Sequence, residues 1–216
     1  MQFYSIKPLQ KRLAIAVLSA QCVLGIQQTY ADALQDLLHI LEPIQGFSAQ
    51  FSQDTFNAQQ VVQQHNEGEL VAQTPNHFYW KTVEPFPQEI ITDGKTLWVY
   101  DPDLQQVTIK PFDENYARTP AMLFAGNAQH IAEQFSVEKI SDKPLTFRLL
   151  PKTGQKDLFV SMDMTFEKSQ PVSMIINDAM QQKSVLNFSH VSINPDTKPD
   201  KFSFIAPAGV DVLKAK

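Results

Sequence analysis

Alternation of apolar and polar residues dominates the chain from residue 47 onward. In FSAQFSQDTF, Phe47, Ala49 and Phe51 alternate with polar neighbours, and similar short runs recur about every ten residues up to residue 193. Turn residues bound nearly all of these runs, for example Thr74-Pro75-Asn76 and Asp93-Gly94. The pattern predicts about eleven strands that follow one another as an antiparallel meander in a single sheet.

Two segments have helical rather than strand periodicity. The four leucines of ALQDLLHIL fall on one helical face, and Pro43 and Gly46 end that helix. In TPAMLFAGNAQHIAEQF, Thr119 can cap a helix with Pro120 at its first position, and Asn127 can cap a second one. The chain therefore combines many strands with one helix and a short helical pair.

These elements restrict the architecture. A sheet of about eleven strands has to curl, because strands twist, and three short helices are too few to bury its whole inner face. We therefore predict a mainly β fold with an α lid, an incomplete, half-open antiparallel barrel covered by short helices. A barrel of this width encloses an apolar cavity rather than a filled core.

The first residues have the order of a secretory signal. Basic residues precede an apolar run at 13–26, and the small residues Thr29 and Ala31 follow at positions that signal peptidase reads. We expect cleavage after Ala31, which gives a signal peptide at 1–31 and a single domain at 32–216. A retained membrane anchor is the alternative.

Cysteine and charge restrict the chemistry of the remaining chain. Cys22 is the only cysteine, and it follows Gln21 rather than the small residue of a lipoprotein signal, so we expect it to leave with the signal peptide. That loss excludes disulfides, thiolate catalysis and cysteine-ligated zinc. The signal contains three of the 18 basic residues and none of the 23 acidic ones, which leaves a net charge of −8. This charge argues against nucleic acid and anionic membrane surfaces as partners.

Candidate catalytic chemistry is sparse. Asp93-Gly94 is typical of a two-residue type I′ hairpin turn, and Asp101-Pro102-Asp103 suits the next turn, so these aspartates are interpreted as turn residues and not as a calcium or acid/base site. The five histidines form no zinc motif, and the chain has neither a G-x-S-x-G elbow nor a glycine-rich phosphate loop. We expect no enzyme, no catalytic residues, no metal and no cofactor.

The segment 68–107 resembles the LolA family of periplasmic carriers of outer-membrane lipoproteins. That family has a Gly-x-Leu strand, a Pro-x-x-Phe-x-Trp strand, and then Asp-Gly-x-x-Leu-Trp-x-Tyr-x-Pro followed by Gln. The matching residues are Gly68 and Leu70; Pro75, Phe78 and Trp80; Asp93, Gly94, Leu97, Trp98, Tyr100 and Pro102; and Gln106. The resemblance continues at TPAMLFAGN and KFSFIAPAGVDV, and it spans essentially the whole chain after the signal.

The resemblance implies a function as well as a fold. Members of the family are periplasmic carriers that take acylated lipoproteins from the inner-membrane LolCDE complex and deliver them to the outer-membrane receptor LolB. Because Gln21 does not suit a lipoprotein signal, the resemblance favours the soluble carrier over LolB, and we expect a monomer. An RseB-like lipid- or lipoprotein-sensing regulator is the alternative, but such proteins usually have an additional domain and this chain ends soon after APAGV. A third hypothesis, an enzyme of the cell envelope, is not supported by any recognisable group of catalytic residues in the sequence.

The resemblance and the strand pattern together suggest which residues contact acyl chains. We expect these to be Phe51, Leu70, Phe78, Trp80, Ile90, Leu97, Val99, Met122, Leu123 and Phe124. The hairpin at Asp93-Gly94 places Ile90 opposite Leu97, with Val99 on the same inward face and Ile91, Trp98 and Tyr100 on the other. Core packing explains Met122, Leu123 and Phe124 equally well, and we assign Phe147, Phe159, Phe166 and Phe188 to packing.

One position departs from the family. Many members have an arginine before the proline of the third strand, where it helps to hold the lid closed, and here that position is Thr74. A threonine lacks the several donors of a guanidinium. Either the lid is held by other contacts, or it opens more readily.

Overall fold

The computed structural model describes residues 32–113, 120–126, 128–152 and 159–215. The signal peptide predicted at 1–31 and the caps predicted at Thr119 and Asn127 lie outside these residues. A helix at residues 32–41 precedes the sheet. The strands are β1 (Gly46–Phe56), β2 (Val62–Gln73), β3 (His77–Glu84), β4 (Gln88–Asp93), β5 (Thr96–Asp101), β6 (Gln106–Pro111), β7 (Phe135–Asp142), β8 (Leu145–Pro151), β9 (Ser161–Glu167), β10 (Gln170–Asn177), β11 (Lys183–Ile193) and β12 (Asp211–Lys214). Short helices lie at η1 (Pro120–Phe124), α3 (Ala128–Gln134) and η2 (Pro199–Phe202).

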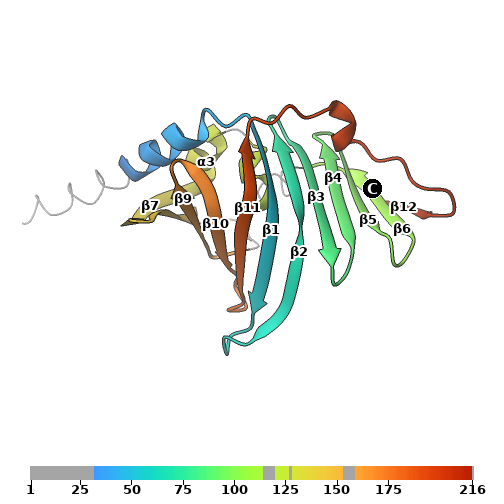
Figure 1. Cartoon of the computed structure of the whole chain (residues 1–216), viewed down its shortest axis with the longest axis horizontal. Helices are drawn as coiled ribbons and strands as arrows, with labels where there is room; N and C mark the ends of the chain where they lie inside the picture. The colour runs from blue at the N-terminus through green and yellow to red at the C-terminus, as the bar shows by residue number, and fades with distance from the viewer. Residues whose placement is uncertain (1–31, 114–119, 127, 153–158, 216) are drawn as a thin grey trace, which may run out of the picture.

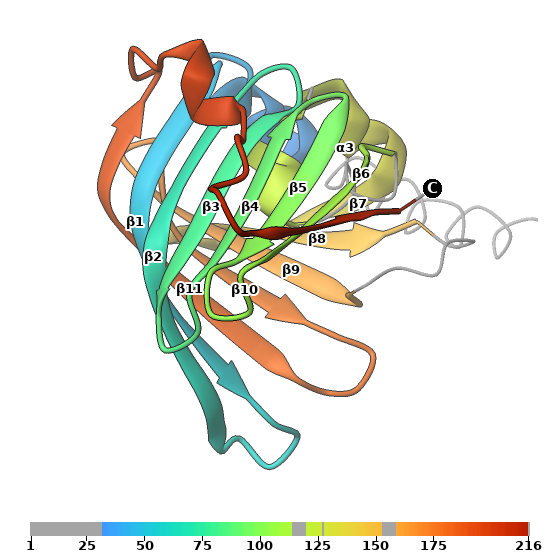
Figure 2. The same cartoon turned by 90° about the vertical axis from the view of Figure 1, so that its right-hand side faces the viewer.

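The sheet is open and strongly curled, and it confirms the expected mainly β fold with an α lid (Figures 1 and 2). Its strand order is β12-β6-β5-β4-β3-β2-β1-β11-β10-β9-β8-β7. The first eleven strands pair antiparallel, as expected, but they form two meanders joined by the β1–β11 pair rather than one. A twelfth strand, β12, was not predicted, and it pairs parallel to β6.

The N-terminal helix, η1 and α3 lie at one end of the curled sheet (Figure 1), and their buried residues join its core. Leu37 and Leu41 of the helix at 32–41 and Ile131 of α3 are buried in one cluster with inward residues of the strands, such as Phe47 and Met162. The first helix of the expected pair is a 3₁₀ helix, η1, of five residues. Among the described residues, no helix is both long and apolar enough to cross a membrane.

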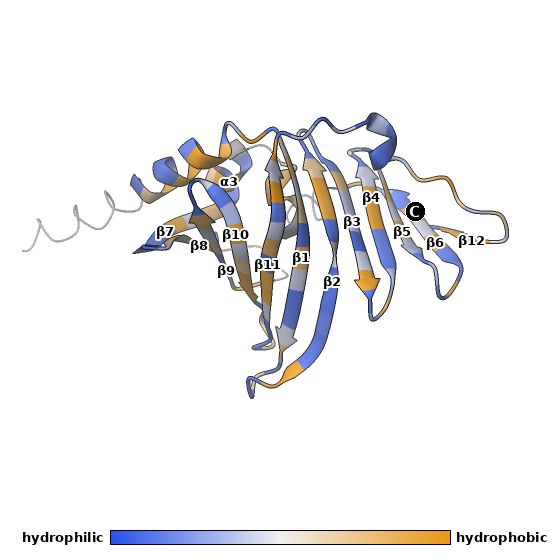
Figure 3. Ribbon diagram, viewed as in Figure 1, coloured by the Kyte–Doolittle hydropathy of each residue, from blue (hydrophilic) through white to orange (hydrophobic). Residues whose placement is uncertain are grey.

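Strand periodicity explains which residues form the core. On β1, Phe47, Ala49 and Phe51 are buried, whereas Gln50 between them is exposed, as their alternation predicts. Figure 3 shows β2 as apolar near the helices and mostly polar farther from them, apart from an apolar segment at its far end, where β2 begins with Val62. Along β2, the surface therefore changes from apolar near the helices to mostly polar farther away.

A second, smaller cluster lies on the outer face of the sheet. The C-terminal segment crosses this face, and Phe202 of η2 is buried there against Tyr79 and Ile91. Lys201 Nζ lies 3.6 Å from the centre of the Tyr79 ring and 3.2 Å from Glu69 Oε1. Both faces of β3 and β4 are thus covered by apolar groups, which explains why their sequences do not simply alternate.

The β4–β5 hairpin corrects one expected register. Ile90 pairs with Val99 and not with Leu97, because the turn consists of Gly94-Lys95 rather than Asp93-Gly94. The Asp93 carboxylate accepts hydrogen bonds from the backbone N–H groups of residues 95 and 96. In this turn Gly94 has a positive φ, 81°, and Lys95 does not, whereas type I′ requires a positive φ at both residues. Each residue of β4 pairs two positions farther along β5 than expected. Because side chains alternate between faces with a period of two, they stay on their expected faces.

Candidate functional site

An apolar cavity of about 330 Å³ lies between the concave face of the sheet and η1. Strands β1 to β5, β10 and β11 contribute to its wall, together with Phe112 after β6 and two residues of η1. The lining residues are Gln53, Leu70, Phe78, Trp80, Ile90, Thr92, Leu97, Val99, Phe112, Met122, Phe124, Met174, Ile176, Leu186 and Phe188. Thirteen of these fifteen side chains are apolar, so the cavity suits an apolar ligand and offers few polar partners.

Eight of the ten residues expected to contact acyl chains line this cavity. They are Leu70, Phe78, Trp80, Ile90, Leu97, Val99, Met122 and Phe124. Phe51 is buried behind Trp80, and their ring centres lie 4.0 Å apart in a stacked arrangement. Leu123 lies instead on a separate hollow between the N-terminal helix and the β2–β3 turn, together with Thr74. These two side chains, Phe51 and Leu123, therefore support the wall or the lid rather than line the cavity.

A large part of the wall was not predicted from the sequence. Met174, Ile176 and Leu186 come from β10 and β11, whose place beside β1 depends on a pairing between distant segments. Phe188 was assigned to packing alone, but it also lines the cavity. The alternation of apolar and polar residues along β10 and β11 could have identified their inward side chains. The sequence did not indicate that β11 pairs with β1.

Aromatic contacts hold the lid helix η1 against the sheet. The Phe124 ring is stacked on Phe47 of β1 with ring centres 4.3 Å apart. Phe188 of β11 approaches both rings edge-on, at 6.0 Å from Phe124 and 5.6 Å from Phe47. Such pairs contribute roughly 0.5–1.5 kcal/mol beyond the area they bury. The roof of the cavity is therefore fixed by a cluster of three phenylalanine rings.

Hydrogen bonds connect neighbouring segments at and near Thr74, the position where the resemblance implies an arginine in many members. The Thr74 hydroxyl lies 3.1 Å from the Gln45 carbonyl and 2.9 Å from Gln45 Oε1, and can donate to either. Two residues later, the Asn76 backbone N–H donates to the Ala125 carbonyl at the end of η1, at 2.8 Å. Thr74 thus binds the segment after the first helix, and the backbone of Asn76 binds the lid.

Thr92 in the wall and Asp101 near it accept hydrogen bonds from turn residues. The Thr92 hydroxyl accepts a hydrogen bond from the backbone N–H of Gly94 at 3.0 Å. The Asp101 carboxylate accepts one from the Leu104 N–H, so the two strand-end aspartates of the 92–107 segment serve its turns. Within the described ranges, His, Cys, Asp and Glu form no group of three or more that could hold a metal ion. The thirteen apolar side chains of the wall suit the cavity to burying apolar groups.

The sequence matches a known protein family and several of its members. Residues 42–205 match the family model described as outer membrane lipoprotein carrier protein LolA. The outer-membrane lipoprotein carrier protein of Hahella chejuensis is 38% identical over 209 residues, which cover 95% of this chain and 98% of that protein. The protein of the same name from Alcanivorax borkumensis is 34% identical over 206 residues, covering 94% and 98%.

A solved structure agrees at the level of the fold. An uncharacterized conserved protein from Thermus thermophilus superposes with a TM-score of 0.53 at 13% sequence identity, covering 84% of this chain and 98% of that one. An open, curled sheet with a helical lid, an apolar cavity beneath that lid, and a family match over about three quarters of the sequence lead to one conclusion. The chain belongs to the LolA family of outer membrane lipoprotein carrier proteins.

Proposed function

We propose that this protein is a periplasmic carrier that shields the acyl chains of lipoproteins between the two membranes. The observation that carries the proposal is the apolar cavity beneath η1, whose wall has thirteen apolar side chains among fifteen. The carrier name of its relatives supports the same role. Cargo would arrive from the LolCDE complex in the inner membrane and leave to LolB in the outer membrane.

The energetics of the cargo make such a protein necessary. Each exposed methylene costs roughly 0.8 kcal/mol in water, so a triacylated protein does not leave a membrane without a substitute for the bilayer. A wall of Leu, Ile, Val, Met and Phe side chains provides that substitute without fixed polar partners. Transfer requires no covalent step if each acceptor binds the acyl chains more tightly than the donor does. A carrier of this kind needs no catalytic residues.

The size of the cavity implies a movement of the lid. At about 330 Å³ it lies at the lower end of the roughly 300–1,000 Å³ range of small-molecule pockets. Three long acyl chains need more space, so we infer that loading displaces η1. The displacement would separate Phe124 from Phe47 and break the bond from Asn76 to Ala125. We propose that the described structure is the form in which η1 is closed over the cavity.

Release of a triacylated lipoprotein from inner-membrane vesicles that contain LolCDE tests this function. Purified protein beginning at Asp32 is expected to bring the lipoprotein into the aqueous fraction. Phe78→Glu places a carboxylate in the cavity wall and should abolish release, because burial of an unpaired charge opposes acyl binding. Phe86→Glu is the matched control, since Phe86 is 68% exposed on the β3–β4 turn. Equal release by both variants would contradict the assigned site.

A further inference from the structure

The inner face of β1 changes from apolar to polar between Phe51 and Gln53. Phe51 is 3% exposed, whereas Gln53 is partly exposed at the edge of the cavity wall. Residues two apart along a strand point to the same face, so both side chains look toward the barrel interior. β1 and β2 continue past this point as a long hairpin (Figure 2); β11 pairs with β1 to its end, whereas β2 extends beyond the end of β3. The hairpin thus extends the inner surface outside the cavity.

The polar character extends to the neighbouring strands. Strand pairing places Asn66 beside Gln53, and places Gln64 and Ser184 beside Thr55. Partners in adjacent strands share a face, and Leu186, which also pairs with Gln53, lines the cavity. These five residues form what we call the polar ledge: Gln53, Thr55, Gln64, Asn66 and Ser184.

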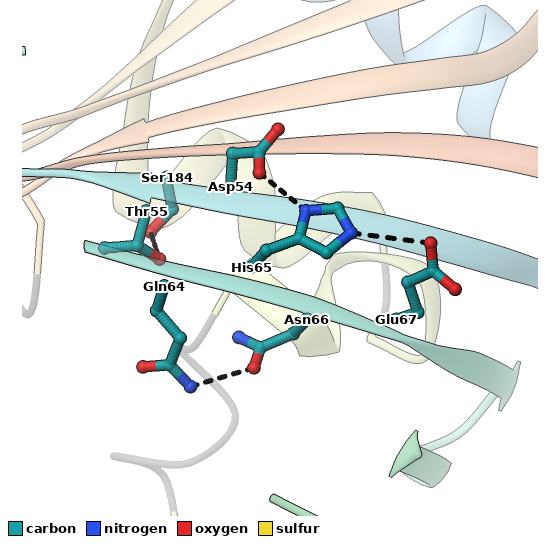
Figure 4. A network of polar contacts seen from close by, with 7 residues as sticks. All are labelled: Asp54, Thr55, Gln64, His65, Asn66, Glu67 and Ser184. Atoms are coloured by element: carbon teal, nitrogen blue, oxygen red, sulfur yellow. Dashed lines mark hydrogen bonds and ion pairs between the residues drawn. The ribbon is translucent and has the colours of Figure 1, made fainter. Parts of the chain in front are cut away.

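The polar ledge carries hydroxyl and carboxamide groups and no charge. Gln64 Nε2 donates to Asn66 Oδ1 at 2.8 Å, and the hydroxyls of Thr55 and Ser184 lie 3.3 Å apart (Figure 4). These bonds leave the second amide hydrogen of Gln64 and further oxygen lone pairs for a ligand. The ledge therefore offers both donors and acceptors next to the apolar cavity.

Charged residues of the same hairpin lie on its other face. Figure 4 shows His65 on the opposite side of the β2 ribbon from Gln64 and Asn66. His65 Nδ1 lies 2.6 Å from Asp54 Oδ1, and its Nε2 lies 3.4 Å from Glu67 Oε1. The hairpin therefore separates a charged outer face from a neutral, hydrogen-bonding inner face.

We propose that the polar ledge binds the first polypeptide residues of an acylated protein, with Gln53 at the junction between acyl chains and peptide. This inference rests on the proposed function, because it assumes that the acyl chains occupy the cavity. A peptide backbone presents alternating N–H and C=O groups, which neutral amides and hydroxyls can pair in any sequence. A carrier of many cargo proteins needs this tolerance.

The ledge suits a peptide better than a phospholipid head group. A phosphate favours arginine, lysine or clustered backbone N–H groups, and none of the five ledge side chains is cationic. An extended peptide instead needs a few donors and acceptors along a strand-like surface. The same ledge can therefore help to distinguish an acylated protein from the bulk lipid of the membrane.

Calorimetric titration of two probes tests the assignment. One probe is a triacylated cysteine followed by three serines, and the other is a free fatty acid of the same chain length. The triple variant Thr55→Val, Gln64→Met and Asn66→Leu keeps side-chain size and removes the polar groups of three of the five ledge residues. We expect it to bind the acylated peptide about tenfold more weakly, through the loss of one or two hydrogen bonds, and to bind the fatty acid within about twofold of the parent.

A matched control uses the outer face of the hairpin. Asp54→Asn with Glu67→Gln removes two charges there and should leave both affinities unchanged. Unchanged affinity of the triple variant for the acylated peptide, or equal weakening for both probes in a variant that melts at the parent temperature, would overturn the role of the ledge. Failure of the parent protein to bind either probe would instead overturn the proposed acyl-binding function itself.

Discussion

The backbone N–H of Asn76 donates a 2.8 Å hydrogen bond to the carbonyl of Ala125, and this bond joins the β2–β3 turn to the end of the lid helix η1. Asn76 has a φ of 60°, an uncommon conformation for a residue other than glycine. Because the bond uses backbone atoms, the lid has a contact to the sheet that does not depend on an arginine side chain. The lid of this protein is therefore fixed by Asn76 and by the Phe124–Phe47 stack.

Restoring an arginine at Thr74 should strengthen the closed lid. Thr74 lies on the same hollow as Leu123, Gly126 and Glu42, so a guanidinium there can reach lid carbonyls and a carboxylate. We expect Thr74→Arg to stabilise the closed form by about 1 kcal/mol and to slow hand-over of cargo roughly fivefold. The measurement is the rate of transfer of a fluorescent acylated peptide to an acceptor. Thr74→Lys, which lacks the planar fork, should have a smaller effect, and faster transfer by Thr74→Arg would contradict this account of the lid.

Gly68 is expected to tolerate no side chain. A Cβ at this position would overlap the Lys81 carbonyl and lie 2.7 Å from the Phe51 ring, which itself stacks on Trp80. Gly68→Ala should therefore lower the free energy of unfolding by roughly 1–3 kcal/mol, measured by urea denaturation. Gly46→Ala is the control, because its Cβ would meet no atom closer than 3.4 Å. Equal stability of the two variants would show that the wall adapts at Gly68.

A bidentate ion pair crosses β8 and β9 on the outer face. Arg148 Nε and Nη2 each donate to one carboxylate oxygen of Asp163 at 2.7 Å, and Asp163 is only 7% exposed. Arg148→Ala leaves that carboxylate buried without its partner and should cost roughly 1.5–3 kcal/mol of unfolding free energy. The double variant Arg148→Leu with Asp163→Leu should recover much of the loss, as thermal unfolding would measure. A double variant less stable than Arg148→Ala would argue against this explanation.

His65 should titrate above the usual range of histidine. The hydrogen bond to Asp54, and after it the bond to Glu67, raises the pKa of His65 above 6.5. Because the folded state binds this proton more tightly than the unfolded chain, the pair stabilises the hairpin fully below pH 6.5. That contribution is lost as the pH rises through the folded-state pKa. In an NMR titration of the ring protons, Asp54→Asn should move the midpoint down toward 6.5, and an unchanged midpoint would exclude the bond as the cause.

The sequence was sufficient to predict the strands and the inward face of most of them. Alternation at Phe47, Ala49 and Phe51 identified buried positions, and a sheet of so many twisted strands had to curl. The faces of β4 and β5 were also correct, even though the turn differs, because both possible turns keep Ile90 and Val99 inward. The strands and their inward faces could therefore be predicted because they depend on the alternation of neighbouring residues.

Long-range pairing was not available from the same patterns. The β1–β11 pair joins segments more than about 120 residues apart and brings Leu186 and Phe188 into the cavity wall. β12 has four residues, all exposed, so its sequence has no apolar alternation that separates it from a loop. The lid contact from Asn76 uses a backbone N–H, which every residue except proline possesses. These features depend on tertiary structure rather than on residue type.

Native mass spectrometry of the protein purified from the periplasm tests the central claim most directly. If the cavity carries lipoprotein acyl chains, the parent protein should appear in part as a complex with the mass of an acylated protein, and Phe78→Glu should lose that complex while Phe86→Glu keeps it. A parent protein that carries only free phospholipid or fatty acid, or that appears without any acylated partner under conditions where cargo is abundant, would contradict the carrier function.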